Sequence, residues 1–351
     1  MEQTQLENEI RQAVEGVEHP AFKRSLGDLG MYDRLEQDGE DVLRVFLKTP
    51  KQDRKQEIDI EAKVRGALQP LQLPGKVKIR FELDESLAPE ETGNRIRGIK
   101  NIVAIGSGKG GVGKSTVTAN LAAALKLRGH AVGVIDADIY GPSLGKLFGF
   151  NGRVALKGDG KNRIDPLDVN GIKLVSFSFM LNPDQAVVWR GPMLGKAVEQ
   201  FLFQVNWGEL DYLLIDLPPG TGDVQLSLAQ LIDLDGAIIV TTPQNVALQD
   251  AGRAAHMFLE VKVPILGVIE NMSLFVCPNC GHESHVFSKN GGQSLASRFK
   301  MPLLGEIPLL GDIMESGEEG EPIVLRERGG PVAQAFLAIA DKLPTEIDKY
   351  R

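Results

Sequence analysis

The chain has 351 residues, which favours two domains over one, since a domain holds roughly 100–200 residues. Its net charge of −8 leaves no overall excess of Lys and Arg to neutralise a phosphate backbone, so nucleic acid is not expected as the main partner. Only two cysteines occur, which excludes a disulfide-stabilised secreted scaffold.

The first residues predict neither export nor membrane anchorage. The segment MEQTQLENEIRQAVEG is polar and acidic, without a basic start or an apolar core, and no run in the chain approaches the roughly 18 apolar residues of a membrane span. We therefore expect a cytoplasmic protein that contacts no membrane.

Residues 1–84 predict a small α+β domain. A polar helix opens it, followed by a strand at Val42–Lys48, a helix at Glu57–Leu68 and a strand at Lys76–Glu82. The next segment is polar, contains Pro and Gly and shows no periodicity, so residues 85–98 are expected to form a linker.

Residues 99–351 predict a doubly wound α/β domain with a mostly parallel sheet. Short runs rich in Val, Ile and Leu do not alternate apolar with polar residues, which is typical of parallel strands buried on both faces; they are IKNIVAIGS, HAVGVIDAD, KLVSFSF, YLLIDLP, GAIIVTT, ILGVIENM and LLGEIP. Amphipathic stretches between them predict crossover helices. The closing helix is expected at Pro331–Leu343, followed by a charged tail.

A phosphate-binding loop lies between the first strand and the first helix of this domain. Its sequence GKGGVGKS matches G-x-x-x-x-G-K-[ST] in the strand-to-helix context that the motif requires. The glycines allow backbone N–H groups to surround phosphate oxygens, Lys114 reaches the β- and γ-phosphates, and the Ser115 hydroxyl suits Mg²⁺. The predicted ATP-binding residues of this loop are Gly108, Lys109, Gly110, Gly111, Val112, Gly113, Lys114, Ser115 and Thr116.

Polar residues end three predicted strands on the edge where a nucleotide would lie. Asp136 and Asp138 close VIDAD, and Asp216 closes YLLID before the PPGTGD loop, so oxygen ligands for Mg²⁺ are expected together. Asp223, at the end of that loop, can equally begin the next helix. Asn271 ends ILGVIEN, and its amide can pair with the adenine edge, although a turn-forming Asn is the alternative.

The two cysteines form the motif Cys277-Pro278-Asn279-Cys280 in a loop of turn-forming residues. A zinc site within one chain would need His282 and His285, at a spacing tighter than in usual zinc fingers. A redox dithiol normally opens a helix of a redox fold. The third possibility is that two chains contribute two thiolates each to a [4Fe–4S] cluster.

The motifs SGKGGVGKS, DADIYGPS, WRGPM, DYLLIDLPPGTGD, IENMS, CPNCG and LGEIPL follow one another across residues 99–312. Together they resemble the Mrp/ApbC-type iron-sulfur cluster carrier ATPases, within the MinD/ParA/nitrogenase-iron-protein class. The resemblance implies a homodimer that hydrolyses ATP, holds a [4Fe–4S] cluster between its subunits through Cys277 and Cys280, and transfers it to apo iron-sulfur proteins, with cluster scaffold proteins as further partners.

The resemblance also implies residue roles. The extra lysine of the loop, Lys109, would cross the dimer to the partner's nucleotide, and Asp138 would orient the attacking water. Asp136 and Asp216 would hold Mg²⁺ mainly through water. Residues 1–84 resemble, more weakly, the small iron-sulfur assembly domain often fused ahead of this ATPase, but the usual cysteine after Thr49-Pro50 is absent, which favours a docking or structural role.

Two other classes share part of this pattern. A ParA/MinD-like positioning ATPase has the same loop, but its membrane form needs a basic amphipathic C-terminal helix, which PVAQAFLAIADKL lacks. A nitrogenase-like reductase takes single cysteines from two distant segments, whereas this chain has one CxxC. Trp189 and Trp207 are expected in the core or an interface, and Asn290 stands where many relatives have a third glycine.

Overall fold

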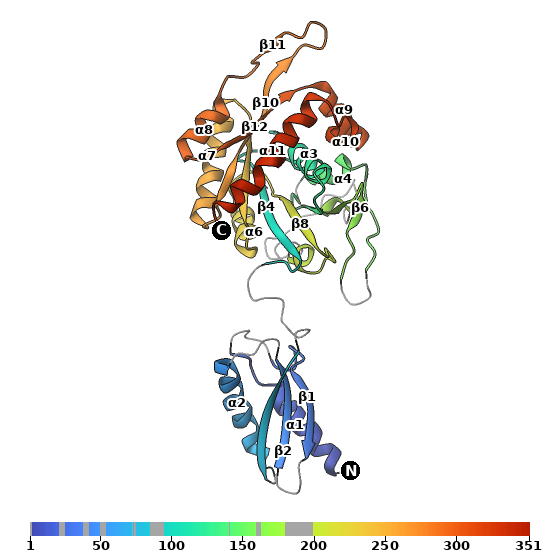
Figure 1. Cartoon of the computed structure of the whole chain (residues 1–351), viewed down its shortest axis with the longest axis vertical. Coiled ribbons are helices and arrows are strands. Elements are labelled where there is room, and N and C mark those ends of the chain that lie inside the picture. Colours follow the sequence, from blue (N-terminus) through green and yellow to red (C-terminus); the bar gives the residue numbers. More distant parts are fainter. Residues whose placement is uncertain are drawn as a thin grey trace. The chain divides into compact units, whose positions relative to one another are not determined.

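The computed structural model describes residues 2–20, 25–37, 42–49, 54–71, 73, 75–84, 95–139, 141–158, 163–179 and 199–351. The chain divides into two compact units, residues 1–93 and 94–351 (Figure 1). Most of the predicted linker, Tyr140 of DIYGPS, and the WRGPM motif with Trp189 lie outside the described residues.

The N-terminal unit is a three-stranded sheet with helices. Strands β1 and β2 are antiparallel, β2 and β3 are parallel, and the sheet order is β1-β2-β3. The prediction did not include β1, because its sequence YDRLEQ is mostly polar and only partly buried. The elements are α1 (Glu2–Glu15), β1 (Tyr32–Gln37), β2 (Val42–Thr49), α2 (Arg54–Leu68), η1 (Gln69–Leu71) and β3 (Lys76–Leu83).

The second unit is built on a nine-stranded sheet of order β11-β10-β9-β4-β8-β5-β7-β6, with β12 paired to β10. Seven neighbouring strands are parallel, which confirms the predicted fold class. The elements are β4 (Ile99–Gly106), α3 (Lys114–Leu127), β5 (Val132–Asp136), α4 (Leu144–Leu147), β6 (Leu167–Val169), β7 (Ile172–Ser176), η3 (Phe177–Phe179), β8 (Leu210–Asp216), α6 (Asp223–Leu231), β9 (Gly236–Thr241), α7 (Asn245–Glu260), β10 (Ile265–Val276), β11 (Glu283–Ser284), α8 (Gly291–Phe299), β12 (Leu303–Leu309), α9 (Gly311–Glu319), α10 (Ile323–Arg326) and α11 (Pro331–Asp348).

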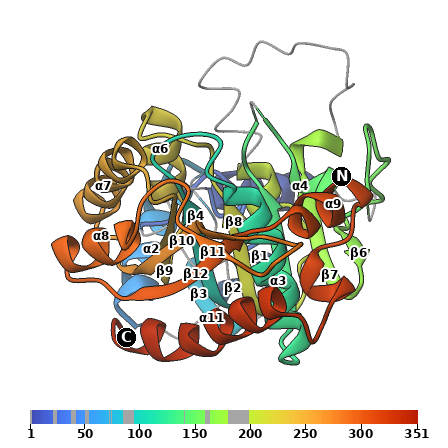
Figure 2. The same ribbon diagram turned by 90° about the horizontal axis from the view of Figure 1, so that it is seen from above.

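Helices cover both faces of this sheet. Strand β4 sends Val103 and Ile105 into one core, which includes α3 and α11, and Ile102 and Ala104 into the other, which includes α6, α7 and α8 (Figure 2). Trp207 is 2% exposed and belongs to the second core, as expected. Because the parallel strands are buried on both faces, their carboxyl ends are held rigidly at one edge.

Several predicted boundaries were wrong. Helix α2 begins at Arg54 rather than at Glu57. Helix α11 does not end at Leu343 but continues to Asp348, because Leu343 and Ile347 extend its buried face past Pro344. Strand β10 does not end at Asn271 but continues to Val276 after a change of register. In the described part of the chain no helix is long and apolar enough to cross a membrane.

Candidate functional site

The loop between β4 and α3 has the backbone geometry of a phosphate cradle. Gly113 has φ +79° immediately before α3, a left-handed conformation that favours glycine, so the first N–H groups of α3 face the loop. At Gly108 an added Cβ would lie 2.0 Å from the carbonyl carbon of Asp250, so only glycine fits there. The predicted loop therefore ends at a helix N-terminus suited to an anion.

Asp216, at the end of β8, is the centre of the polar network beside this loop. The Lys114 ammonium lies 2.8 Å from its Oδ2, and Ser115 donates a 2.6 Å hydrogen bond to the same oxygen. Thr118, one turn further along α3, donates to Oδ1 at 2.7 Å. Lys114 and Asp216 have side chains 6% and 0% exposed, so the carboxylate balances the loop's buried cation.

Asp136 and Asp138 complete the acidic edge. Asp136 lies beside Asp216 in the register of β5 and β8 and accepts hydrogen bonds from the Ser176 hydroxyl at 2.8 Å and the Leu144 backbone N–H at 3.0 Å. Burial, and then the nearby Asp216 charge, raise the pKa of Asp136 to about 7. Asp138 lies 4.0 Å from the Lys114 ammonium, so the structure brings all three predicted carboxylates to the loop.

These residues fit a divalent cation. Two buried carboxylates that repel each other, next to the Ser115 hydroxyl, form an all-oxygen donor set of the kind that Mg²⁺ takes. A cation there would relieve the repulsion that raises the pKa of Asp136.

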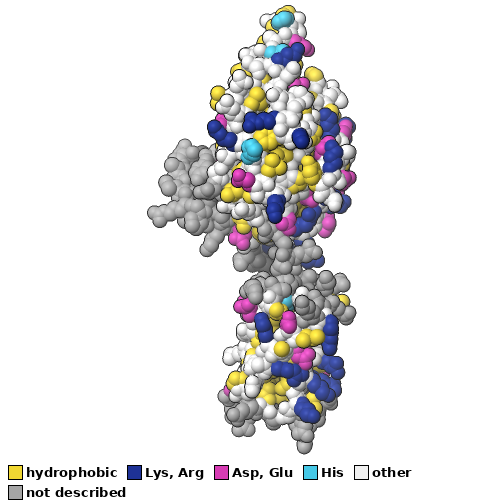
Figure 3. Space-filling model, turned by 90° about the vertical axis from the view of Figure 1, so that its left-hand side faces the viewer, with side chains coloured by type: hydrophobic (Ala, Val, Ile, Leu, Met, Phe, Trp, Pro, Cys, Tyr) yellow, Lys and Arg dark blue, Asp and Glu magenta, His cyan; other side chains and the backbone are white. Residues whose placement is uncertain are grey.

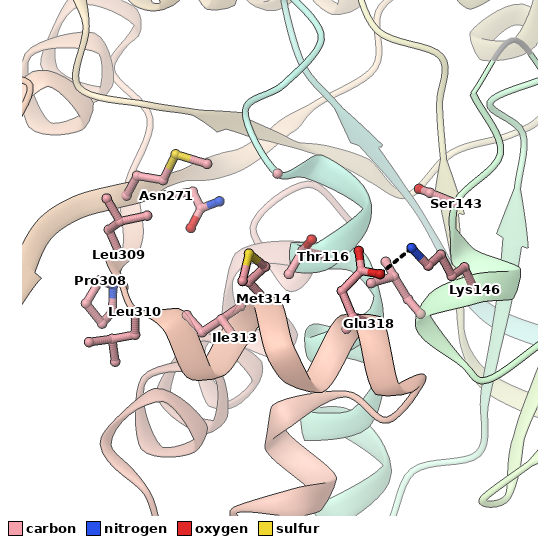
Figure 4. Close-up of a pocket in the computed structure, with 14 residues that line it drawn as sticks. Thr116, Ser143, Lys146, Asn271, Pro308, Leu309, Leu310, Ile313, Met314 and Glu318 are labelled. Atoms are coloured by element: carbon pink, nitrogen blue, oxygen red, sulfur yellow. Dashed lines mark hydrogen bonds and ion pairs between the residues drawn. The ribbon is translucent and has the colours of Figure 1, made fainter. Parts of the chain in front are cut away.

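A cavity of about 390 Å³ adjoins the loop (Figure 4). Asn271 lies in its wall and donates a 2.9 Å hydrogen bond to the carbonyl oxygen of Val112. An ion pair of 2.5 Å joins Lys146 of α4 to Glu318 of α9 in the lining. The remaining lining is largely apolar and comprises Gly113, Thr116, Ser143, Leu147, Met272, Pro308, Leu309, Leu310, Ile313, Met314 and Gly317.

Lys109 differs from Lys114. Lys109 is half-buried. Its ammonium has no hydrogen bond or ion pair among the residues that the structure describes. Its backbone carbonyl accepts a 3.0 Å hydrogen bond from the Ser107 hydroxyl, while the Gly220 N–H donates to the Ser107 carbonyl at 3.0 Å. The PPGTGD loop is thus tied to the phosphate loop.

The two cysteines lie in the hairpin between β10 and β11, at one end of the unit (Figure 1). The Cys277 N–H donates to the His282 carbonyl at 3.0 Å, and the Gly281 N–H donates to the Cys277 carbonyl at 2.9 Å. Backbone N–H groups of Asn279 and Cys280, and then the Cys280 side chain, lower the pKa of Cys277, so its thiolate is favoured. Cys277 is partly exposed and Cys280 is exposed.

The histidines considered for zinc are not gathered with these thiols. Within the described ranges no group of three or more His, Cys, Asp or Glu side chains is arranged to hold a metal ion. The Nδ1 of His285 instead lies 3.1 Å from the Ser273 carbonyl oxygen. The CxxC motif also begins no helix, unlike a thioredoxin-type dithiol.

Sequence reasoning missed several residues around the site. Thr118 lies four residues after Lys114 on the same face of α3, a helical spacing that could have identified it. Ser176, paired with Asp136 across β5 and β7, is visible only once strand order is known. The same holds for the Lys146–Glu318 ion pair.

Comparison with known proteins gives a consistent result. Residues 98–344 match the ParA-type family model described as the NUBPL iron-transfer P-loop NTPase. The iron-sulfur cluster carrier protein of Aquifex aeolicus is 42% identical over 96% of this chain and 99% of its own. The nucleotide-binding protein of Archaeoglobus fulgidus, solved with ADP, is 38% identical, with a TM-score of 0.59 over 68% of this chain and 93% of its own. The septum site-determining protein MinD of Pyrococcus horikoshii, complexed with Mg-ADP, is 25% identical, with a TM-score of 0.52 over 72% of this chain and 99% of its own.

Proposed function

Because this chain belongs to the NUBPL iron-transfer family of P-loop NTPases, we propose that it is an iron-sulfur cluster carrier that hydrolyses ATP. In this proposal a homodimer holds one [4Fe–4S] cluster and delivers it to apo iron-sulfur proteins, receiving it from a cluster scaffold protein. A reducing compartment such as the cytoplasm suits its two free thiols.

The observation that carries the proposal is the cysteine hairpin. Cys277 and Cys280 are accessible, a hydrogen-bonded turn holds them together, and the lowered pKa of Cys277 favours the ligating thiolate. A [4Fe–4S] cluster takes four sulfur ligands, and each chain has only these two cysteines. Two hairpins meeting on a two-fold axis would supply the full set.

The network at Asp216 supports ATP as the energy source. Lys114 and the N–H groups of the loop would bind the phosphates, and Ser115, Asp136 and Asp216 would hold Mg²⁺, whose charge neutralises phosphate oxygens when it is bound. The Ser115 hydroxyl would then give up its hydrogen bond to Asp216. Asp138, 4.0 Å from the Lys114 ammonium, would orient the attacking water molecule.

The 390 Å³ cavity would take the base. Its apolar side chains suit a planar ring, and the Asn271 amide can both donate to and accept from adenine. Lys109, whose ammonium has no partner among the described residues, would reach the nucleotide of the second subunit.

A positioning ATPase with a membrane-binding C-terminal helix is less well supported. The apolar face of α11, including Val332, Phe336 and Ile339, is buried against the core that contains α3. That face is therefore not available for a lipid surface.

Anaerobic reconstitution with iron and sulfide tests the proposal. The parent should take up about half a [4Fe–4S] cluster per chain and elute as a dimer. The double variant Cys277→Ala/Cys280→Ala should lose the cluster while keeping ATP binding. The matched control His282→Ala alters an exposed hairpin residue and should retain the cluster. A monomer with a full cluster, or zinc bound one per chain through His282, would contradict the proposal.

A further inference from the structure

The sheet of the N-terminal unit has one face that no described helix covers. Leu43, Val45 and Leu47 of β2 pack into the core formed with α1 and α2. The alternate residues Arg44 and Phe46 lie on the opposite face, since neighbouring side chains of a strand point to opposite sides. This open face carries an unusual distribution of charge.

One half of the open face is electrically balanced. The Arg34 guanidinium lies 3.9 Å above the Phe46 ring and pairs with Glu36 at 2.7 Å and Glu82 at 2.9 Å. Lys48 pairs with Asp84 at 3.1 Å. The acidic side chains on this face are therefore already paired.

The other half is a cationic strip, which we define as Lys76, Lys78 and Arg80. Lys76, Lys78 and Arg80 are exposed at alternate positions of β3, about 7 Å apart. Where the structure describes the chain, none of these three side chains has an ion pair or hydrogen bond. Arg44 lies directly beside Lys78 in the β2–β3 register. Figure 3 shows Lys and Arg side chains gathered along one side of this unit.

Fold stability does not explain the strip. Lys76, Lys78 and Arg80 have no ion pair or hydrogen bond among the described residues and so add little to the stability of the sheet, whereas Arg44 lies opposite Glu36 in the β1–β2 register. Lysines on an edge strand such as β3 deter aggregation, a role that leaves the same cations open to a partner. Residues 1–93 contain 20 Asp and Glu against 14 Lys and Arg, so these cations are concentrated within an otherwise acidic unit.

We propose that the cationic strip is a docking surface for an acidic segment of a partner protein, bound in an extended conformation. Acidic residues at alternate positions of an extended segment have the same spacing of about 7 Å as the strip. Single-stranded nucleic acid suits the face less well, because Phe46 is only 9% exposed beneath Arg34 and offers no ring for a base.

The test uses the full chain and a fluorescent ten-residue peptide of alternating Glu and Ser. Anisotropy at low salt should show saturable binding, which 0.5 M salt should abolish because it screens exposed charges. The variant Lys78→Glu/Arg80→Glu should weaken binding at least tenfold, and Lys78→Gln/Arg80→Gln by a smaller factor. The matched control Arg11→Glu/Arg54→Glu makes the same change of net charge at exposed positions of α1 and α2 and should bind as the parent does.

Three results would overturn the proposal. The parent could fail to bind the peptide at low salt, or the control could weaken binding as much as the strip variant. An oligo-dT strand could also bind more tightly than the peptide and be lost in the strip variant, which would assign the strip to nucleic acid. Circular dichroism of each variant establishes that the sheet remains folded. None of these measurements needs ATP or a cluster, so the result is independent of the function proposed above.

Discussion

Replacing Lys114 by Ala should have two measurable effects at the phosphate loop: a loss of stability from the broken ion pair with Asp216, and a loss of nucleotide binding. Removing one partner of a buried ion pair typically costs 3–5 kcal/mol, because the remaining charge is uncompensated. Asp216 keeps the hydroxyl donors Ser115 and Thr118, so we expect the lower end, about 3 kcal/mol. For a unit of this size that lowers Tm by roughly 6–12 °C. Calorimetry of the nucleotide-free protein measures it, and titration with a labelled ATP analogue should show lost binding.

Lys109→Ala is the matched control, since it removes the same charge from the same loop. Its ammonium has no partner among the described residues, so Tm should change by less than about 2 °C. Adding Asp216→Asn to Lys114→Ala should recover part of the lost Tm, because the uncompensated charge disappears. If Lys114→Ala melted within 2 °C of the parent, or if Asp216→Asn deepened the loss, the buried pair would not carry the stability assigned to it.

Three further predictions concern the same edge of the sheet. Asp138→Asn should bind ATP but not hydrolyse it, as phosphate release will show; turnover at the parent rate would remove Asp138 from the role proposed for it. Gly113→Ala should destabilise the protein by about 1–3 kcal/mol in urea unfolding, because φ is +79° and the added Cβ would lie 2.2 Å from the Asn271 amide nitrogen. Since the pKa of Asp136 is about 7 when folded and near 3.8 when unfolded, its ionisation should make the nucleotide-free protein less stable as pH rises from about 4 to 7; Asp136→Asn should flatten that trend, and an unchanged trend would argue against it.

The parallel strands were predictable because each is a short apolar run that needs no alternation when both faces are buried. The VIDAD and YLLID runs also located Asp136 and Asp216, since a carboxylate directly after such a run lies at the carboxyl edge of the sheet. The phosphate loop was predictable for a similar reason: its glycines are dictated by local backbone geometry, as at Gly113. These features depend on neighbours within a few residues.

Features that depend on distant segments were not predictable. The polar strand β1 exists because it pairs with β2, and YDRLEQ carries too little apolar periodicity to show it. The sequence of β3 predicts an ordinary exposed strand face at Lys76, Lys78 and Arg80. Only the strand register shows that Arg44 lies beside Lys78. The hydroxyl of Ser176 likewise reaches Asp136 through strand order rather than through any local motif.

Strand β10 contains one part that local sequence predicts and one part that depends on distant segments. The run ILGVIENM predicts a strand ending at Asn271, yet Met272 has φ +56°, a conformation uncommon for any residue but glycine, and the pairing with β12 shifts register between Asn271 and Phe275. Contacts on either side support this irregularity: the Asn271 amide donates to Val112, and the Ser273 hydroxyl donates to the Ile307 carbonyl at 3.1 Å. The strand then continues to Val276. Asn271 in the cavity wall and Cys277 in the hairpin are therefore only six residues apart on one continuous segment, which spans at most roughly 20 Å. The nucleotide and cysteine parts of the proposed activity are joined by a single strand rather than carried by separate elements.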